Sequence, residues 1–309
     1  MVQSRSPGAR RTAQSGTDLR SINAAGLNGL MASRFSRRAA LLGLASAPAF
    51  AALGPRGYEL TQPTLYVDGL DPAHEGLRVA QLSDIHVRSN TPDERVLAAI
   101  REINAIKPDL VFLTGDFLTF SRSPIPAVSE LLEGLEAPTF AVLGNHDHFV
   151  DAQSVIGSLN DSGYVVLRNQ HTVTRLRGAP LTIFGVDDGG TGNDDVAKTF
   201  KGGSKDGTRL VITHNPITAR KLPQNEGLLC FSGHTHGGQI VIPPITDAVM
   251  RAAGQPYIRG RYDVGGNQLY VNRGLGFGRH HQFLHHGSEP EVAVFTLKSR
   301  QESWPDIGR

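Results

Sequence analysis

Two histidines, two positions apart, follow a short apolar run in the second half of the chain. The run covers residues 228–231, which predicts a buried strand, and Ser232 and Gly233 separate it from His234 and His236. Side chains two positions apart on an extended chain point to the same side, so both imidazoles can face one site. Imidazole nitrogens bind transition metals, and the spacing therefore predicts a metal site at the end of this strand.

The same arrangement occurs four more times, with an apolar run of strand length ending at Asp, Asn or His. A single Asp after a strand is usually a turn residue or a helix cap, and a single His is usually structural. Five such strand ends in one chain instead favour a shared metal site. The runs 78–82, 109–114, 140–143 and 210–213 are followed by Asp84 and His86, by Asp116, by Asn145, His146 and Asp147, and by His214.

Three oxygen donors and four imidazoles are more ligands than one metal ion needs. Catalytic zinc takes about three protein ligands, whereas two ions about 3.5–4 Å apart, bridged by one carboxylate, would use the whole set. Asp116 is the natural bridge, because its carboxylate has two oxygens and an Asn lacks the charge. Oxygens and imidazoles without a thiolate favour Mn, Fe or Zn over copper. The expected cofactors are therefore two divalent metal ions.

The elements between these strand ends predict a parallel sheet. Residues 93–106 carry apolar residues at helical spacing between Pro92 and Pro108, and further helices are expected over 125–135 and 152–159. Alternating strands and helices form parallel sheets, and side chains at the carboxyl ends of such strands share one crevice.

A second, partly antiparallel sheet is expected after residue 163, where short links replace the helices. Its first strands are expected over 164–167, 173–176 and 181–186. The remaining expected elements are an edge strand near 64–67, loops over 187–190 and 201–207, a short helix over 217–222, and strands near 268–272 and 291–297.

Composition indicates a soluble globular protein, with 39% hydrophobic and 19% charged residues in 309. The first 51 residues hold seven arginines and a single acidic residue, so the rest of the chain is slightly acidic. No basic face indicates nucleic acid binding. The single cysteine, Cys230, lies in a predicted buried strand, where we expect it to act as a small core hydrophobe.

The N-terminal residues resemble an export signal. We expect residues 1–30 to be a disordered extension and Met31 to be an alternative start. Residues 31–51 contain Arg37 and Arg38, an apolar run and small residues at a cleavage pattern, and resemble a twin-arginine signal peptide. They predict export by the twin-arginine translocase to the periplasm or cell envelope. An uncleaved leader would be a membrane anchor, and a basic surface helix is the alternative.

In order and spacing, these motifs resemble the five signature blocks of calcineurin-like metallophosphoesterases over residues 77–298. The segments 233–239 and 272–276 resemble an exported bacterial phosphodiesterase branch, which includes enzymes that cleave UDP-diacylglucosamine in lipid A biosynthesis. The resemblance implies a four-layer α/β/β/α sandwich with two mixed sheets. We expect this domain over 52–298 and a C-terminal tail over 299–309. The blocks are Asp84-x-His86, Gly115-Asp116, residues 144–147, His214 and Gly233-His234-x-His236.

The resemblance also implies residue roles. A hydroxide bridging the two metals would attack phosphorus, and His146 would protonate the leaving oxygen or stabilise its charge. Asp147 would orient His146, the alternative being a cap for the helix at 152–159. The first metal would be held by Asp84, His86 and His236, and the second by Asn145, His214 and His234, with Asp116 bridging.

Two further features leave alternatives open. Arg273 could contact a substrate phosphate or brace its own loop. Four histidines between Gly276 and Pro290 could contact substrate or metal, although a solvated loop is favoured. Thr119 stands where purple acid phosphatases carry a tyrosine, so a tyrosinate-bound ferric ion is not expected. The four histidines are His280, His281, His285 and His286.

We therefore expect a phosphodiesterase or pyrophosphohydrolase acting on a phosphate ester, with UDP-diacylglucosamine or a phospholipid at the membrane surface as candidate substrates. A broad-specificity phosphomonoesterase and a non-catalytic metal-binding scaffold are the alternatives. A Ser-His-Asp hydrolase is a weaker one, because the chain lacks a Gly-x-Ser-x-Gly motif.

Overall fold

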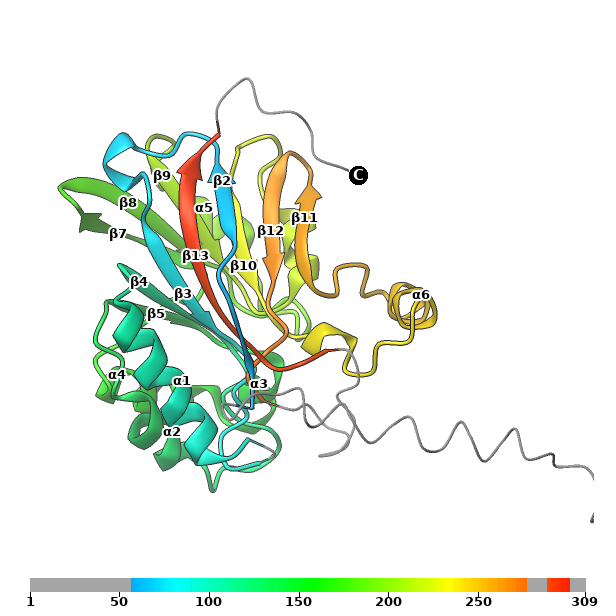
Figure 1. Cartoon of the computed structure of the whole chain (residues 1–309). Coiled ribbons are helices and arrows are strands. Elements are labelled where there is room, and N and C mark those ends of the chain that lie inside the picture. Colours follow the sequence, from blue (N-terminus) through cyan, green and yellow to red (C-terminus); the bar gives the residue numbers. More distant parts are fainter. Residues whose placement is uncertain (1–56, 90, 277–287, 301–309) are drawn as a thin grey trace, which may run out of the picture. The chain divides into compact units, whose positions relative to one another are not determined.

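The computed structural model describes residues 57–89, 91–276 and 288–300. The expected export signal, the His-rich segment and most of the expected tail lie outside these residues. The described part of the chain forms two mixed β-sheets that pack face to face, with helices on their outer faces (Figure 1). In this part of the chain, no helix is long and apolar enough to cross a membrane.

The first sheet has the strand order β1-β13-β3-β4-β5-β6, and β2 also pairs with β13. Strands β3 to β6 run parallel, as the alternation with helices predicts, and β13 is antiparallel to β3. The strands are β1 (Glu59–Thr61), β2 (Thr64–Val67), β3 (Arg78–Leu82), β4 (Leu110–Thr114), β5 (Thr139–Val142), β6 (Val165–Val166) and β13 (Glu291–Ser299).

The second sheet has the order β11-β12-β10-β9-β8-β7. Its four inner strands are parallel, and the edge strands β7 and β11 are antiparallel to their neighbours, so the expected partly antiparallel sheet is confirmed. The strands are β7 (Gln170–Leu176), β8 (Ala179–Gly185), β9 (Thr208–Ile212), β10 (Leu229–Ser232), β11 (Gly260–Val264) and β12 (Asn267–Val271).

Three apolar layers hold the sandwich together. The layer between the sheets contains Phe112, Phe231 and Phe295, with ring centroids 5.0–5.3 Å apart from one to the next. A second layer joins the first sheet to α1, α2 and α4, and a third joins the second sheet to α5 and the 3₁₀-helix η3. The expected four-layer α/β/β/α arrangement is therefore confirmed. These helices are α1 (Asp93–Ile106), α2 (Ile125–Leu132), α4 (Ala152–Asp161), α5 (Val196–Phe200) and η3 (Pro216–Lys221).

Cys230 is fully buried in the third layer, as expected, and burial raises the pKa of its thiol to about 12. Several short elements were not expected from the sequence, among them β1, β11 and α5. The others are η2 (Pro72–His74), α3 (Asn145–Val150), η4 (His236–Gly238) and α6 (Ile245–Ala252).

The placement of β6 differs from the sequence prediction. Residues 164–167 were expected in the second sheet, but Val165 and Val166 pair with β5 in the first. Leu167 N also donates to Ala141 O at 2.8 Å. The first sheet therefore gains one more parallel strand before the chain crosses to the second.

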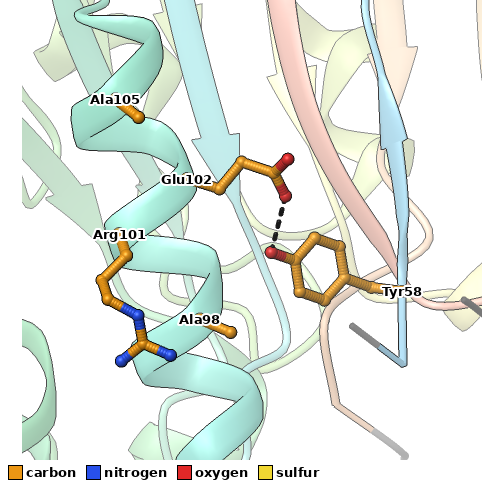
Figure 2. Close-up of a pocket in the computed structure, with 5 residues that line it drawn as sticks. All are labelled: Tyr58, Ala98, Arg101, Glu102 and Ala105. Atoms are coloured by element: carbon orange, nitrogen blue, oxygen red, sulfur yellow. Dashed lines mark hydrogen bonds between the residues drawn. The ribbon is translucent and has the colours of Figure 1, made fainter. Parts of the chain in front are cut away.

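A surface pocket of about 320 Å³ lies between Tyr58 and α1 (Figure 2). The Tyr58 hydroxyl donates to Glu102 Oε2 at 2.8 Å, and Ala98, Arg101 and Ala105 line the helix side. None of the expected metal ligands lines this pocket, so the candidate chemistry lies elsewhere.

Candidate metal centre

The seven expected ligands converge from both sheets. Asp84 is joined to the second sheet by the backbone of His234, whose N–H donates to Asp84 Oδ2 at 3.0 Å. Gln81 Nε2 makes a similar link to Ser232 O at 3.0 Å. The carboxyl ends of five strands therefore meet, as parallel sheets favour. Asp84 and His86 follow β3, Asp116 follows β4, Asn145 follows β5, His214 follows β9, and His234 and His236 follow β10.

The first ligand group consists of Asp84, His86 and His236, whose donor atoms all lie within 4.8 Å of one another. The Nε2 atoms of His86 and His236 are 3.3 Å apart, and His236 Nε2 is 3.4 Å from Asp84 Oδ1. All three residues are buried. The group offers one oxygen and two nitrogens to a single point.

The second group consists of Asp116, His214 and His234, with donor atoms again within 4.8 Å of one another. His214 Nε2 is 3.2 Å from both Asp116 Oδ2 and His234 Nδ1. Asn145 Oδ1 adds a fourth donor, 2.9 Å from His234 Nδ1.

Asp116 faces both groups with the same oxygen. Its Oδ2 lies 3.2 Å from His214 Nε2 in the second group and 3.9 Å from His86 Nε2 in the first. The other oxygen, Oδ1, accepts a hydrogen bond of 2.9 Å from the backbone N–H of His146. This is the position that a bridging carboxylate would occupy.

Backbone carbonyls fix the protonation of the imidazoles. Nδ1 of His86 lies 2.8 Å from Leu118 O, and Nδ1 of His236 lies 3.2 Å from Gly276 O. A carbonyl only accepts, so each Nδ1 carries a hydrogen and Nε2 is the ring nitrogen that faces the site. His214 is held in the same way by Thr114 O at 2.7 Å. The two Nε2 atoms of His86 and His236, 3.3 Å apart, are therefore both placed to bind one cation.

Electrostatics agree with this donor set. Burial lowers the pKa of His86 to about 4, and burial with the charge of His214 lowers the pKa of His234 to about 4. Burial alone would raise the pKa of Asp116, but His214 and His86 hold it well below its usual range. Burial by itself would lower the pKa of His214, but the neighbouring Asp116 carboxylate raises the pKa of His214 well above its usual value. A divalent cation would compete with that proton.

The backbone at the ligands is unusual. A positive φ is uncommon for residues other than glycine, although Asp and His tolerate it better than most, and such conformations concentrate at functional sites. Close approach also requires glycine at position 144, where a Cβ would overlap the Asp116 carboxylate. The ligands with positive φ are Asp84 (51°), His86 (48°), Asp116 (56°), His234 (76°) and His236 (49°).

His146 lies beside the ligands without being part of either group. Its Nδ1 lies 2.6 Å from Thr119 O, so Nδ1 carries the hydrogen and Nε2 is left for another partner. The ring is edge-on to His86 at 5.2 Å and to Phe120 at 4.8 Å between centroids. Sequence reasoning did not identify Thr119 O, because a backbone carbonyl leaves no trace in residue type.

The expectation that Asp147 orients the His146 ring is not met. Asp147 Oδ1 accepts from the amides of Phe117 and Leu118 at 2.9 and 3.0 Å, and Oδ2 accepts from those of Asp116 and Gly144 at 3.0 and 2.9 Å. The carboxylate thus holds the loop that carries Asp116. Burial and the charge of Asp116 raise its pKa to about 7.

Asp147 does not have its alternative role as the cap of α4 either, because Asp151 caps that helix through its side chain.

For Arg273, the structure favours bracing of its own loop over binding of a substrate phosphate. Its guanidinium lies 2.7 Å from Glu59, 3.3 Å from Glu291 and 4.0 Å from Glu289. Three carboxylates already surround this cation.

Sequence reasoning missed a contact between α3 and the loop after β8. Asp187 Oδ1 lies 2.6 Å from His148 Nε2, and Asp187 Oδ2 accepts from Arg168 Nε at 2.7 Å. A signal was present, because Asp187 follows an apolar run just as the metal ligands do. Gln255 was also missed. Its Nε2 is 3.4 Å from His234 Nε2.

The sequence profile of the calcineurin-like phosphoesterase family matches residues 77–238. The chain is also similar to an uncharacterized metallophosphoesterase of Bacillus subtilis, YkuE. The two are 34% identical over 86% of this chain and 99% of that protein.

Two relatives have names that state an activity. The phosphodiesterase YaeI of Escherichia coli is 32% identical over 71% of this chain and 82% of its own length. The UDP-2,3-diacylglucosamine pyrophosphatase LpxG of Chlamydia trachomatis is 28% identical over 71% of this chain and 83% of its own length. The profile match and the similarity to YkuE show that the chain belongs to the calcineurin-like phosphoesterase family of hydrolases.

Proposed function

We propose that the chain hydrolyses phosphodiester or pyrophosphate bonds with the help of two divalent cations, drawn from Mn, Fe or Zn. One observation carries this proposal. Oδ2 of Asp116 faces two separate groups of metal-type donors, 3.2 Å from one and 3.9 Å from the other. A single metal ion would leave one of these groups without a function.

The proposed ligand roles follow the two groups. Asp116 is shared because its carboxylate stays ionised and points between them. When bound, the two cations would lower the pKa of a water molecule. They would also place positive charge beside the phosphate oxygens. Asp84, His86 and His236 would hold one cation, and Asn145, His214 and His234 the other.

His146 is proposed as the catalytic acid. Its Nδ1–H is bound to Thr119 O, which orients the ring and leaves Nε2 as the nitrogen that can carry a proton to the leaving oxygen. Phe120 lies edge-on to this ring, with 4.8 Å between the centroids. Asp147 would support this role indirectly, because it fixes the backbone between Asp116 and Leu118.

We propose a substrate with an organic group on each side of the phosphate or pyrophosphate. The names of the relatives support this class, since one is a phosphodiesterase and another a pyrophosphatase of UDP-2,3-diacylglucosamine. UDP-diacylglucosamine and phospholipids are therefore the first substrates to test. A broad-specificity phosphomonoesterase is the alternative enzyme.

The test is turnover by the purified protein loaded with Mn. Hydrolysis of bis-p-nitrophenyl phosphate well above that of p-nitrophenyl phosphate supports the diesterase, and the reverse order supports a monoesterase. Tight metal binding without turnover of either compound, with any of the three metals, would indicate the non-catalytic scaffold.

We also propose export to the periplasm or cell envelope by the twin-arginine translocase, on the strength of Arg37, Arg38 and the apolar run after them. The double variant Arg37→Lys with Arg38→Lys should trap the precursor in the cytoplasm. Cell fractionation measures where the protein accumulates. Unchanged export of the double variant would contradict this route. The matched control is Arg5→Lys with Arg10→Lys, because these two arginines precede the expected leader.

A further inference from the structure

Helix α6 carries an apolar stripe that faces away from the protein. Ile245, Ala248, Val249 and Ala252 recur at the i, i+3, i+4 and i+7 spacing that forms one face of a helix. All four are exposed, with 58% of Ile245 and 59% of Val249 accessible, and no residue of α6 is buried. Such a stripe normally packs on the core of a soluble domain, so α6 has the opposite orientation.

Polar contacts hold α6 in this orientation. Thr246 Oγ1 donates to Ile240 O at 2.6 Å, and Arg259 donates to Asp247 Oδ1 at 3.1 Å. Ile240 and Ile242, in the segment before the helix, are also exposed. Figure 1 shows α6 standing clear of the two sheets. We call Ile240, Ile242 and the four stripe residues of α6 the α6 surface.

Helix α6 lies next to the expected metal ligands. Met250 in α6 and Gln255 just after it line a pocket of about 210 Å³ together with His234 and His236. The helix follows η4, which itself begins at His236. The helix that carries the α6 surface therefore also forms one wall of the pocket that contains these ligands.

A second exposed apolar group adjoins the same ligands from another element. Phe120 and Phe149 are 51% and 67% exposed. Their rings lie 4.8 and 6.2 Å from the His146 ring, which is 5.2 Å from His86. Apolar surface therefore flanks the ligands from the α6 side and from the α3 side.

We propose that the α6 surface docks on an anionic phospholipid bilayer, and that the metal centre acts there on lipid-borne phosphate esters. The second part of this statement rests on the proposed function, whereas the docking does not. Interfacial helices place their apolar face about 5–10 Å into the boundary between headgroups and acyl chains. The aliphatic residues of α6 suit that depth.

Two observations favour a bilayer over a protein partner. An eight-residue helix is about 12 Å long, which offers far less than the roughly 800 Å² that each partner of a stable complex buries. Arg251, in the last turn, is exposed and has no ion pair within the described residues, so it can meet an anionic headgroup.

A site-specific probe tests the docking. Cys230 is the only cysteine of the chain and is buried, so a fluorophore on the full-length Val249→Cys variant reports on α6 alone. The matched control is Val173→Cys on β7, because Val173 is 56% exposed and Val249 59%. We expect an NBD label at position 249 to shift to the blue with vesicles of equal parts phosphatidylglycerol and phosphatidylcholine, and the label at 173 to stay unchanged.

Three results would overturn the docking proposal. These are no shift at position 249, an equal shift at both positions, and a shift at 249 that follows protein concentration without vesicles, which would indicate a second copy instead. Because the label needs no turnover, an inactive protein that still shows the shift would refute the proposed function and leave the docking intact.

A kinetic comparison tests the second part. Ile245→Ser with Val249→Ser should lower hydrolysis of a long-chain phospholipid in these vesicles about tenfold, since two aliphatic side chains no longer enter the lipid. Turnover of soluble bis-p-nitrophenyl phosphate should be unchanged. The matched control is Val165→Ser with Val173→Ser, at positions 43% and 56% exposed. Equal effects of the two double variants on lipid hydrolysis would overturn the proposal.

Discussion

The imidazole of His146 is held on one side by a carbonyl and on another by aromatic rings. Thr119 O fixes its Nδ1–H at 2.6 Å, while His86 and Phe120 lie edge-on to the ring. No such constraint is needed for a surface histidine. This fixed orientation supports the proposed role of His146 as the catalytic acid.

His146→Ala should lower turnover of bis-p-nitrophenyl phosphate about 10²–10⁴-fold, because general acid catalysis contributes that much. Both metals should remain, since His146 belongs to neither ligand group. Steady-state kinetics with metal analysis by mass spectrometry measures both effects. Loss of a metal equivalent from the variant would instead make His146 a ligand.

Gly144→Ala should abolish binding of both metals without changing any charge. The added Cβ would overlap the carboxylate and backbone N of Asp116, which faces both ligand groups. Metal content of the purified protein is the measurement. Gly157→Ala is the matched control, because nothing lies within 4 Å of its added Cβ, and it should keep both metals. Normal occupancy in Gly144→Ala would contradict the shared role of Asp116.

At the scale of elements, the site depends on how α3 meets the second sheet. His148 of α3 and Arg168 after β6 both bind Asp187, in the loop after β8. Burial alone would raise the pKa of Asp187, but His148 and Arg168 lower it. The stabilisation is therefore present above the usual Asp pKa, about 3.9, and is lost as pH falls through the lower folded value.

Asp187→Asn should lower the free energy of unfolding by about 1–3 kcal/mol at neutral pH, since a buried charged acceptor is removed. The difference from the wild type should narrow only below about pH 4. Urea titrations over a pH series measure this. Asp206→Asn, in an exposed loop, should change stability by less than about 0.5 kcal/mol. If the difference in the free energy of unfolding between Asp187→Asn and the wild type stayed constant down to acid pH, the ionised Asp187 carboxylate would not be the source of the stabilisation.

The inner strands and the long helix could be predicted because their signals are local. Residues 78–82 and 93–106 were predicted with the bounds that β3 and α1 have in the structure. The proposed metal ligands could be named from the sequence because each follows an apolar run. The partner of His146 could not, because the Thr119 carbonyl depends on how a loop folds back.

Two other differences between the predicted and the observed elements, at β6 and at α6, have physical causes. Val165 and Val166 form a strand of two residues, too short for its pattern to show which sheet it joins. Helix α6 was missed because Pro243 and Pro244 precede an apolar stripe that does not reach the core. The apolar residues of a helix in a soluble domain normally point toward the core, and those of α6 do not.

At the scale of the molecule, metal binding should stabilise the whole sandwich, because the ligands come from both sheets. Removing metal with EDTA should lower the melting temperature by about 5–10 °C, and Mn should restore it. Differential scanning calorimetry measures the shift. The Gly144→Ala variant should show no such response. An unchanged melting temperature in the wild type would mean that the ligands do not join the sheets through metal.

Five of the seven ligands have a left-handed backbone. Each such residue costs of order 1 kcal/mol or more, and glycine at the same place would relieve that cost. Hydrolysis and thermal robustness therefore make opposite demands on the same five positions. In a descendant released from the need to hold metal, selection would no longer maintain this backbone cost, so these five positions should be among the first at which such a lineage changes.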